Sequence, residues 1–371
     1  MMRPANKAAL ASYLKSKVTI VTHLPDGAQY VLDGGHLIHV VVWPENATYQ
    51  DIIDAVVQYV MRHYGPGTCV LFDGYGSECI CTKASEQVRR AALGMSSDII
   101  YERFMQVTEK QESFLRNRKN KDRFIKDVIE DLHKNGIIAI QDEADVDPLV
   151  VSTAVKLAQD KPEDPVVLVG KDCDLFIMDT SLSSPDSNMY FLSSISPIEM
   201  VSIKDMHQQL GHVRRQLMVC HALTGCDTTS SLFGKGKLTA VDIMATHPHV
   251  PEIPDTFLKS EATHEEIEHA GEKFLFILYK AKPSVKSLND LRHKMYNAKC
   301  KTVKELRMQT LPPTSAAAKK HSFRAYHTVQ QWMGRRLNPF EWGYIHSVHT
   351  SGRSGGGGLL LLHAVCLSQS D

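Results

Sequence analysis

The 371-residue chain carries 42 Lys and Arg against 42 Asp and Glu, so its formal net charge is zero. This balance gives no global signature of nucleic-acid binding, although carboxylates gathered at a metal site would cancel part of a local basic patch. The length accommodates one α/β domain of roughly 250 residues plus an appendage. Residues 1–17 predict a short helix rich in Ala and Lys, within an N-terminal extension that reaches residue 27.

Four short apolar runs predict the strands of a buried, mostly parallel sheet, with helix-like stretches between them. They cover residues 30–32, 68–72, 137–140 and 166–169. The predicted fold class is therefore α/β, with a central sheet flanked by helices. Sheets of this kind bind ligands beyond the carboxyl ends of their strands, so the residues that follow these runs are candidates for a functional site.

Acidic residues follow each of these runs, and one more acid lies later in the chain. The set comprises Asp33, Asp73, Glu143, Asp145, Asp172, Asp174 and Asp227. Carboxylates brought together from several strand ends repel one another unless a cation lies among them. Such oxygen ligands suit Mg²⁺ or Mn²⁺, and two ions of this kind can clamp the attacking and leaving oxygens of a phosphodiester.

Two pairs of these acids, Glu143 with Asp145 and Asp172 with Asp174, are each separated by two positions. Residues two apart share a face only in extended backbone, so both pairs are predicted on extended or turn segments at strand ends. Pro148 agrees, because proline suits the first turn of a helix that opens nearby. Each acid taken alone could instead be a helix N-cap or part of an Asx-turn. Capping, however, does not require the acids to share a site.

With these motifs the chain resembles the flap-endonuclease branch of the PIN-like 5′-nuclease superfamily. In that family a D-x-x-x-L-I-type segment, an F-D-G, an E-A-[DE] pair, a D-x-D pair and a G-x-D supply the metal ligands. The resemblance covers about residues 28–245 and implies a PIN-like nuclease domain that holds two Mg²⁺ or Mn²⁺ ions through the seven acids. Family members begin near the first strand, so the extension here indicates either a remodelled entry to the site or a fragment of a longer ancestor.

A glycine- and lysine-containing run follows Asp227. It consists of Gly234, Lys235, Gly236 and Lys237. Flap endonucleases have a helix–two-turn–helix here, over about residues 220–245, with glycines at the same offsets. Glycine lets the backbone approach a phosphate closely, and lysine adds attraction that does not depend on sequence. The resemblance therefore implies that this run binds duplex phosphates, whereas the run by itself would be an ordinary solvated turn.

Lys83 and Arg90 lie seven residues apart and so share one face of a helix. The family has a lysine and an arginine at this spacing at the foot of a helical arch, where they contact the scissile phosphate. The resemblance makes Lys83 and Arg90 the candidate catalytic cations, with Arg89 as the alternate. An exposed, charged helix face is the alternative interpretation.

The segment from residue 95 to 135 is polar and basic. In the family it belongs to the arch, over about residues 80–135, through which a single strand threads. A cationic arch would follow a single-stranded backbone, with Phe114 or Tyr101 available for stacking on bases. A mobile, solvated loop is the alternative.

Residues 246–347 are predicted to be mostly helical, with helices over residues 265–281, 285–298 and 315–333. Trp332 and Trp342 are expected to pack in a core rather than form a binding platform. Residues 348–371 form a low-complexity tail that is predicted to be disordered and to carry no function. The sequence contains no clamp-binding motif of the Q-x-x-[LIM]-x-x-aromatic-aromatic type.

The eight cysteines form no C-x-x-C pair, and several lie in apolar surroundings typical of buried free thiols. Together with the absence of a signal peptide, they indicate a nuclear or cytosolic protein that is not secreted. The leucine run at residues 359–362 is too short to span a membrane.

Taken together, these features predict a divalent-metal-dependent, structure-selective nuclease that hydrolyses phosphodiesters of branched or single-strand-containing DNA, with RNA as another substrate. The competing hypothesis is a catalytically inactive PIN-like protein that binds nucleic acid or acts as a scaffold. Asteroid-like proteins of the superfamily have this ambiguity, and such a gene could be domesticated from a mobile element. A third interpretation is a plain α/β domain in which all the acids are caps.

Overall fold

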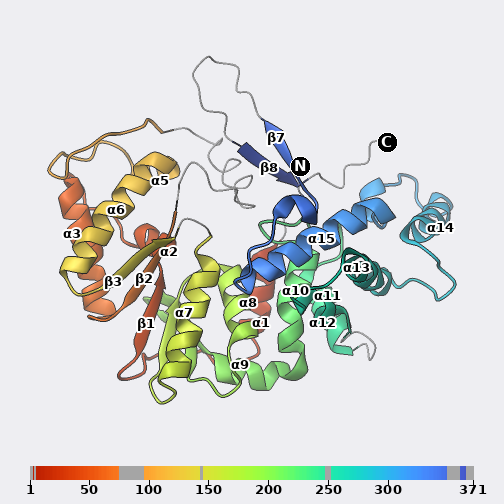
Figure 1. Cartoon of the computed structure of the whole chain (residues 1–371), viewed down its shortest axis with the longest axis horizontal. Helices are drawn as coiled ribbons and strands as arrows, with labels where there is room; N and C mark the ends of the chain where they lie inside the picture. Colours follow the sequence, from red (N-terminus) through yellow and green to blue (C-terminus); the bar gives the residue numbers. More distant parts are fainter. Residues whose placement is uncertain are drawn as a thin grey trace. The chain divides into compact units, whose positions relative to one another are not determined.

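The computed structural model describes residues 3, 6–74, 96–142, 145–246, 252–348 and 360–364 (Figure 1). The chain divides into two compact units. The first, here called the sheet unit, is Val18–Gln208, and the second, the helical unit, combines Met1–Lys17 with Gln209–Asp371. The domain boundaries predicted from the sequence stay predictions.

The sheet unit is built on a six-stranded sheet with the order β3-β2-β1-β4-β5-β6. Strands β1 to β5 are parallel, and β6 pairs antiparallel with β5. The strands are β1 (Gln29–Asp33), β2 (Cys69–Asp73), β3 (Ile138–Asp142), β4 (Val166–Val169), β5 (Met189–Ile195) and β6 (Ile198–Ser202). The predicted α/β fold with a mostly parallel central sheet is confirmed. The last two strands were not identified from the sequence.

Helices cover both faces of this sheet. One face packs against α2 (Gly34–Val40), α3 (Tyr49–His63), α5 (Gln111–Arg116) and α6 (Arg118–Lys134). The other face packs against α7 (Asp147–Asp160), which contacts β1, β4 and α8 (Cys173–Leu182). A further helix, α9 (Ile203–Leu210), follows β6. The result is a layered α/β arrangement in which every second strand residue points to the same layer of helices.

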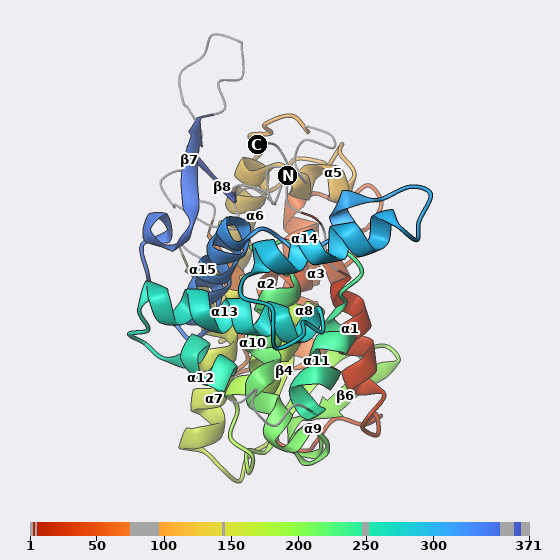
Figure 2. The ribbon, with the colours of Figure 1, turned by 90° about the vertical axis from the view of Figure 1, so that its right-hand side faces the viewer.

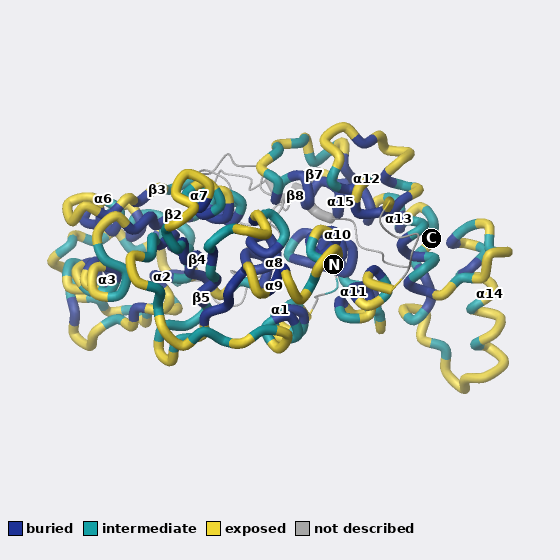
Figure 3. The backbone as a smooth tube through the Cα atoms, turned by 90° about the horizontal axis from the view of Figure 1, so that it is seen from below, coloured by how far each residue is buried: buried dark blue, intermediate teal, exposed yellow. Residues whose placement is uncertain are grey.

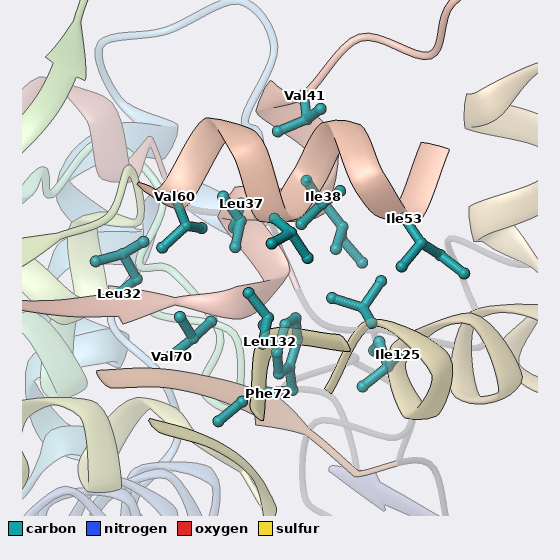
Figure 4. Close-up of a cluster of buried hydrophobic side chains, with 14 of the residues drawn as sticks. Leu32, Leu37, Ile38, Val41, Ile53, Val60, Val70, Phe72, Ile125 and Leu132 are labelled. Carbon is teal, nitrogen blue, oxygen red and sulfur yellow. The ribbon is translucent and has the colours of Figure 1, made fainter. Parts of the chain in front are cut away.

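The core of the sheet unit lies between the strands and the α2, α3 and α6 helices, as Figure 4 shows. Leu32, Val70 and Phe72 point from the strands toward this layer and are almost fully buried. Helix α6 contributes Phe124, Ile125, Val128 and Leu132, whose spacing places them on one helical face.

Strand β3 differs from the prediction of a fully buried strand. Ile138 and Ile140 are 53% and 47% exposed, whereas Ala139 between them is buried. The strand lies at the edge of the sheet, and its side chains alternate between the covered layer and the surface. An apolar run four residues long could not reveal this, because it fits an edge strand and a central strand equally well.

The aromatic residues predicted to stack on bases have a different role. Phe114 is completely buried, and the ring of Tyr101 stacks on Tyr49 with centroids 3.8 Å apart. The Tyr101 hydroxyl donates a hydrogen bond of 2.6 Å to Asp127. Phe114 is therefore part of the core, and the prediction that it is available to a single strand is wrong. Tyr101 is partly buried against the core, with one face of its ring covered by Tyr49.

Several basic residues of the same segment are paired with acids. Arg123 donates to Asp98 at 2.6 Å, Lys119 lies 3.0 Å from the same carboxylate, and Arg116 pairs with Glu112. Helices α5 and α6 pack against the core, so the alternative of a mobile loop is also wrong for these two elements.

The helical unit contains most of the predicted helices. They are α1 (Lys7–Lys15), α10 (Arg214–Thr224), α11 (Lys237–Thr246), α12 (Glu252–Leu258), α13 (His264–Leu278), α14 (Leu288–Cys300) and α15 (Ser315–Trp332). Short 3₁₀ turns lie at Gly211–Val213, Met308–Thr310 and Pro339–Trp342. The helices predicted within residues 1–17, 265–281, 285–298 and 315–333 are confirmed.

The predicted disordered tail is wrong in one part. Strand β8 (Leu360–Ala364) lies within the predicted tail of residues 348–371 and pairs antiparallel with β7 (Tyr344–Val348), which begins before it. Trp332 and Trp342 are 3% and 9% exposed, which confirms their packing role. Cys69, Cys220 and Cys226 are buried free thiols, as predicted, and Cys173 is buried as well. In the described ranges there is no helix with the length and apolarity needed to cross a membrane.

Candidate metal centre

The carboxyl ends of four neighbouring strands each lead to an aspartate. Asp33, Asp73 and Asp142 are the last residues of β1, β2 and β3, and Asp172 follows β4. The chain runs from β1 outward to β3 and then returns to place β4 on the other side of β1. Doubly wound sheets bind ligands at this change of direction, beyond the carboxyl ends of the strands.

The strand register sets the direction of these side chains. Asp73 lies opposite Asp142, and Asp33 lies opposite Leu71. Because partners in parallel strands point to the same face, the three terminal aspartates are on the face opposite Phe72 and its core layer. The Oδ1 atom of Asp73 accepts a hydrogen bond of 3.0 Å from the Val146 amide, just before α7.

Two of the acids cap helices. Oδ1 of Asp33 accepts hydrogen bonds from the amides of Gly35 and His36, at 2.8 and 3.2 Å, at the start of α2. Oδ1 of Asp172 accepts one from the amide of Asp174, at 3.1 Å, at the start of α8. The capping alternative is thus confirmed for both residues. The bonds to Asp33 use a single carboxylate oxygen, so capping and ligand binding are compatible at this residue.

The charge environment of Asp33 distinguishes it from an ordinary cap. Burial raises the pKa of its carboxyl to about 6, and the negative charges of Asp73 and then Asp172 add to this. The hydrogen bonds from the His36 and Gly35 amides act in the opposite direction, lowering the pKa. Three carboxylates at the strand ends therefore repel one another, and a cation among them would relieve the repulsion.

Glycines allow the backbone to close around this position. A Cβ atom on Gly34 would overlap the ring of Phe72, so only glycine lets α2 begin directly after Asp33. A Cβ on Gly170 would lie 3.0 Å from Leu175 Cδ1 and 3.6 Å from Asp33 Cβ. The end of β4 thus approaches Asp33 closely.

The remaining acids of the sheet unit occupy turn and helical positions. Asp145 precedes α7, and its Oδ1 accepts a hydrogen bond of 3.4 Å from the Asp147 amide. Asp174 lies in the first turn of α8 and is almost completely buried. The prediction of an extended or turn conformation is correct for Asp145 and Asp172 and wrong for Asp174, because the helix begins one residue after Asp172. Pro148 lies in the first turn of α7, as predicted.

The carboxylates at the strand ends are the right type of ligand for a divalent metal, but their arrangement does not form a complete metal site. Carboxylate oxygens are the ligands that Mg²⁺ and Mn²⁺ prefer. Among the described residues, no group of three or more His, Cys, Asp or Glu side chains is arranged to hold a metal ion. Four predicted site residues lie outside the described residues, namely Lys83, Arg89, Arg90 and Glu143. Their roles stay predictions.

Asp227 belongs to the helical unit and is paired there with a lysine. It lies in the loop after α10, and its Oδ1 is 2.5 Å from Nζ of Lys7 on α1. The two side chains are 15% and 19% exposed. The ammonium group of Lys7 is therefore paired with Asp227, which was predicted to be a metal ligand.

The run from residue 234 to 237 forms a turn that leads into α11. Gly234 has a φ of 66°, which favours glycine, and Leu232 forms an isolated bridge with Lys235. Lys237 is buried, and its Nζ donates to the carbonyls of His221, at 3.0 Å, and Gly225. The ammonium is thus used at the C-terminal end of α10, and the predicted phosphate contact is wrong for this lysine.

Asp142 was missed as a site candidate. It ends β3 and lies opposite Asp73, so it belongs to the same row of strand-end acids. The available signal was its place immediately after the apolar run at residues 137–140, next to Glu143.

The chain is similar to three solved structures of "the catalytic core of Rad2 in complex with DNA substrate". The sequence identities are 15%, 16% and 16%, and the TM-scores are 0.43, 0.44 and 0.41. The similarity covers 88% of this chain and 94%, 95% and 94% of the Rad2 chains. No protein-family model matches the sequence, and no curated protein matches it. At this level of similarity, function has to be inferred from the residues themselves.

Proposed function

We propose that this protein is a divalent-metal-dependent, structure-selective nuclease that hydrolyses phosphodiesters of DNA in the manner of flap endonucleases. The observation that carries the proposal is the row of aspartates at the carboxyl ends of β3, β2, β1 and β4. Burial is the main cause of the raised pKa of Asp33, and the negative charges of Asp73 and Asp172 raise it further. An arrangement of this kind costs stability unless it binds a cation.

In this proposal Asp33, Asp73 and Asp172 would be ligands of the cation, although in the structure their side chains are not gathered closely enough to hold one. Glu143, Asp145 and Asp174 complete the ligand set of two Mg²⁺ or Mn²⁺ ions. The chemistry that bound divalent ions supply is a lowered pKa of a bound water and neutralisation of the charge on the phosphate.

Two further groups of residues would act on the substrate. Lys83 and Arg90, with Arg89 as the alternate, would polarise the scissile phosphate. Gly234, Lys235 and Gly236 would contact duplex phosphates through backbone amides and one ammonium.

A second candidate function has its own supporting observation. The Lys7–Asp227 pair gives that acid a partner within the protein, as expected where a metal site has been lost. This favours a protein that binds nucleic acid or acts as a scaffold without catalysis, as the Asteroid-like hypothesis holds. The two functions differ in metal dependence, so the same measurement separates them.

The experiment is cleavage of a 5′-labelled flap or nicked duplex with Mg²⁺ or Mn²⁺, comparing wild type with Asp33→Asn. Asparagine caps helices as well as aspartate does, so this substitution keeps the start of α2 and removes only the charge. The control is Asp51→Asn, which changes an exposed carboxylate in the capping box of α3. Thermal melting with and without Mn²⁺ is recorded for all three proteins.

The expected result is metal-dependent cleavage and Mn²⁺-dependent stabilisation in wild type and Asp51→Asn, both lost in Asp33→Asn. A folded wild type that shows neither stabilisation by Mn²⁺ nor cleavage of flap, nicked, hairpin or single-stranded substrates would support the inactive protein. If Asp33→Asn cuts as wild type does, Asp33 is a cap alone and the assignment of the metal centre to the strand-end aspartates fails.

A further inference from the structure

One segment of the helical unit is strongly basic although the whole chain is neutral. Residues 279–307 contain nine Lys and Arg and two Asp and Glu. The basic residues are Lys280, Lys282, Lys286, Arg292, Lys294, Lys299, Lys301, Lys304 and Arg307. The segment comprises the α13–α14 connection, α14 and the loop after it, which Figure 2 shows in light blue.

This segment is largely at the surface. Most of its lysines are exposed, and Figure 3 draws α14 and the following loop mainly in the exposed colour. Of the two acids, Asp290 lies in the first turn of α14 and pairs with Lys294 at 2.8 Å. One acid is thus already neutralised locally, and the excess positive charge faces solvent.

Tyr279, at the start of the basic segment, contacts Lys235 of the turn formed by residues 234–237. Nζ of Lys235 lies 4.9 Å from the centre of the Tyr279 ring, in a cation–π contact. Burial lowers the pKa of Lys235, and the charges of Lys280 and then Lys299 lower it further. Three ammonium groups from distant parts of the sequence are therefore close enough to repel one another.

Two guanidinium groups extend the same cluster. Burial raises the pKa of Tyr279 to about 12, while the charges of Arg3 and Arg292 act against this shift. Arg292 also donates to the carbonyl of Pro312 at 2.5 Å, which fixes its side chain. Cations gathered in this way are unfavourable until an anion binds between them.

We propose that Lys235, Tyr279, Lys280, Arg292 and Lys299, here called the Tyr279 surface, bind the phosphodiester backbone of duplex nucleic acid. The surface continues the turn at Gly234 and Gly236, and so extends the phosphate contacts into α14. The inference rests on the proposed function in one respect, that the chain acts on nucleic acid. It adds a binding surface for which the sequence resemblance supplies no residue except Lys235.

A duplex backbone is favoured over a single strand by the state of the aromatic ring. Single-strand sites combine positive charge with open aromatic faces on which bases stack. Tyr279 is 7% exposed and has Lys235 over its ring, so it offers no such face. The exposed ring of Tyr296 on α14 is not one of the residues of the Tyr279 surface. Charge without stacking suits regularly spaced phosphates.

The test is the affinity of the full chain for a fluorescent blunt duplex, measured by anisotropy in EDTA between about 50 and 200 mM salt. The variant is Lys280→Gln with Lys299→Gln. Lys280 has a φ of 53°, and glutamine there keeps the same backbone strain. Lys299 donates to Thr310 at 2.7 Å, and the glutamine that replaces it keeps a polar group near that hydroxyl. The matched control is Lys156→Gln with Lys161→Gln, two exposed lysines of the sheet unit.

We expect the variant to bind about tenfold or more weakly, with a salt slope smaller by about 2, since each phosphate contact contributes about 0.9. The control should match wild type. Lys282→Gln with Lys301→Gln, two exposed lysines of the same segment, should show a smaller loss in the same direction, and serves if the first variant melts early.

A folded Lys280→Gln, Lys299→Gln variant with unchanged duplex affinity and unchanged salt slope would contradict the proposal that the Tyr279 surface binds duplex. The proposal would also fail if the wild-type protein bound only single strands, or bound no nucleic acid at all. It would fail as well if the wild-type protein bound an acidic polypeptide such as polyglutamate more tightly than duplex. EDTA removes metal-dependent chemistry, so this measurement is independent of cleavage. A wild type that binds duplex through these lysines but never cuts would refute the nuclease and keep the surface.

Discussion

Nζ of Lys7 lies 2.5 Å from Oδ1 of Asp227, so the N-terminal helix supplies a counter-charge to the last acid of the predicted ligand set. Both side chains are mostly withdrawn from water. Loss of Lys7 would remove a counter-charge from a mostly buried carboxylate, which costs more than loss of an exposed pair.

Lys7→Met is therefore expected to lower the free energy of unfolding by about 1 to 3 kcal/mol, measured by urea unfolding of the full chain. Lys319→Met is the control, because Lys319 and Glu268 are 42% and 40% exposed and should contribute less than about 1 kcal/mol. If Asp227 is a metal ligand, Mn²⁺ should restore the stability of Lys7→Met but not that of Lys7→Met with Asp227→Asn. Equal losses in the Lys7 and Lys319 variants would contradict the prediction.

Gly34→Ala is expected to destabilise the sheet unit, because its Cβ would overlap the Phe72 ring in the packed core. The cost should be about 1 to 3 kcal/mol, typical of overpacking, and Phe72→Leu should recover part of it in the double variant. Gly236→Ala is the control, since a Cβ there meets nothing within 4 Å. The midpoint of urea unfolding reports both effects. A Gly34→Ala protein as stable as wild type would show that the ring can move aside at no cost.

Stability should depend on pH through Asp179, a fully buried acid on α8. Burial raises its pKa to about 7, although Ser183 donates a hydrogen bond of 3.0 Å to Oδ1. The unfolded chain releases this proton near pH 4. Between about pH 4 and 7 the folded state therefore holds the extra proton, and stability falls as the pH rises.

Asp179→Asn should remove that fall. At pH 8 the variant should be more stable than wild type by up to about 4 kcal/mol, at about 1.4 kcal/mol per pKa unit, and the difference should shrink toward pH 4. Urea unfolding at a series of pH values measures this. The carboxyl of Asp33, whose pKa is about 6, makes the free energy of unfolding fall further between about pH 4 and 6 when no metal is present. This second fall should remain in Asp179→Asn. A parallel pair of stability curves would contradict the role of Asp179.

Tyr101→Ala should lower stability by about 2 to 4 kcal/mol, because it removes the stack on Tyr49 and leaves Asp127 without its hydroxyl donor. Affinity for single-stranded DNA should not change in the folded fraction. Tyr296→Ala, at a ring that is 41% exposed, controls for loss of an aromatic group. If Tyr101→Ala instead retains its stability and loses single-strand affinity, the ring binds nucleic acid.

The apolar runs sufficed to predict four parallel strands and the acids at their ends, because strand burial and the position of a ligand edge follow from local composition and topology. The packing of Phe114 and Tyr101 was not predicted, since charges dominate that segment and hide the helical spacing of Phe124, Ile125, Val128 and Leu132. The role of Lys237 depends on α10 ending beside it, a contact between turns that no local pattern expresses. The Lys7–Asp227 pair joins residues more than two hundred positions apart, and the resemblance offered no partner for it.

The connectivity of the two units has a consequence for dissecting this protein. Residues 18–208 form an insertion in the helical unit, because α1 packs against α11 although the whole sheet unit separates them in sequence. Cutting the chain at residue 17 or 208 would leave the helical unit as two peptides held together by non-covalent contacts, the Lys7–Asp227 pair among them. Trimming α1 to obtain a shorter protein would thus remove part of the helical unit's own interior, including the buried Leu10 and Leu14.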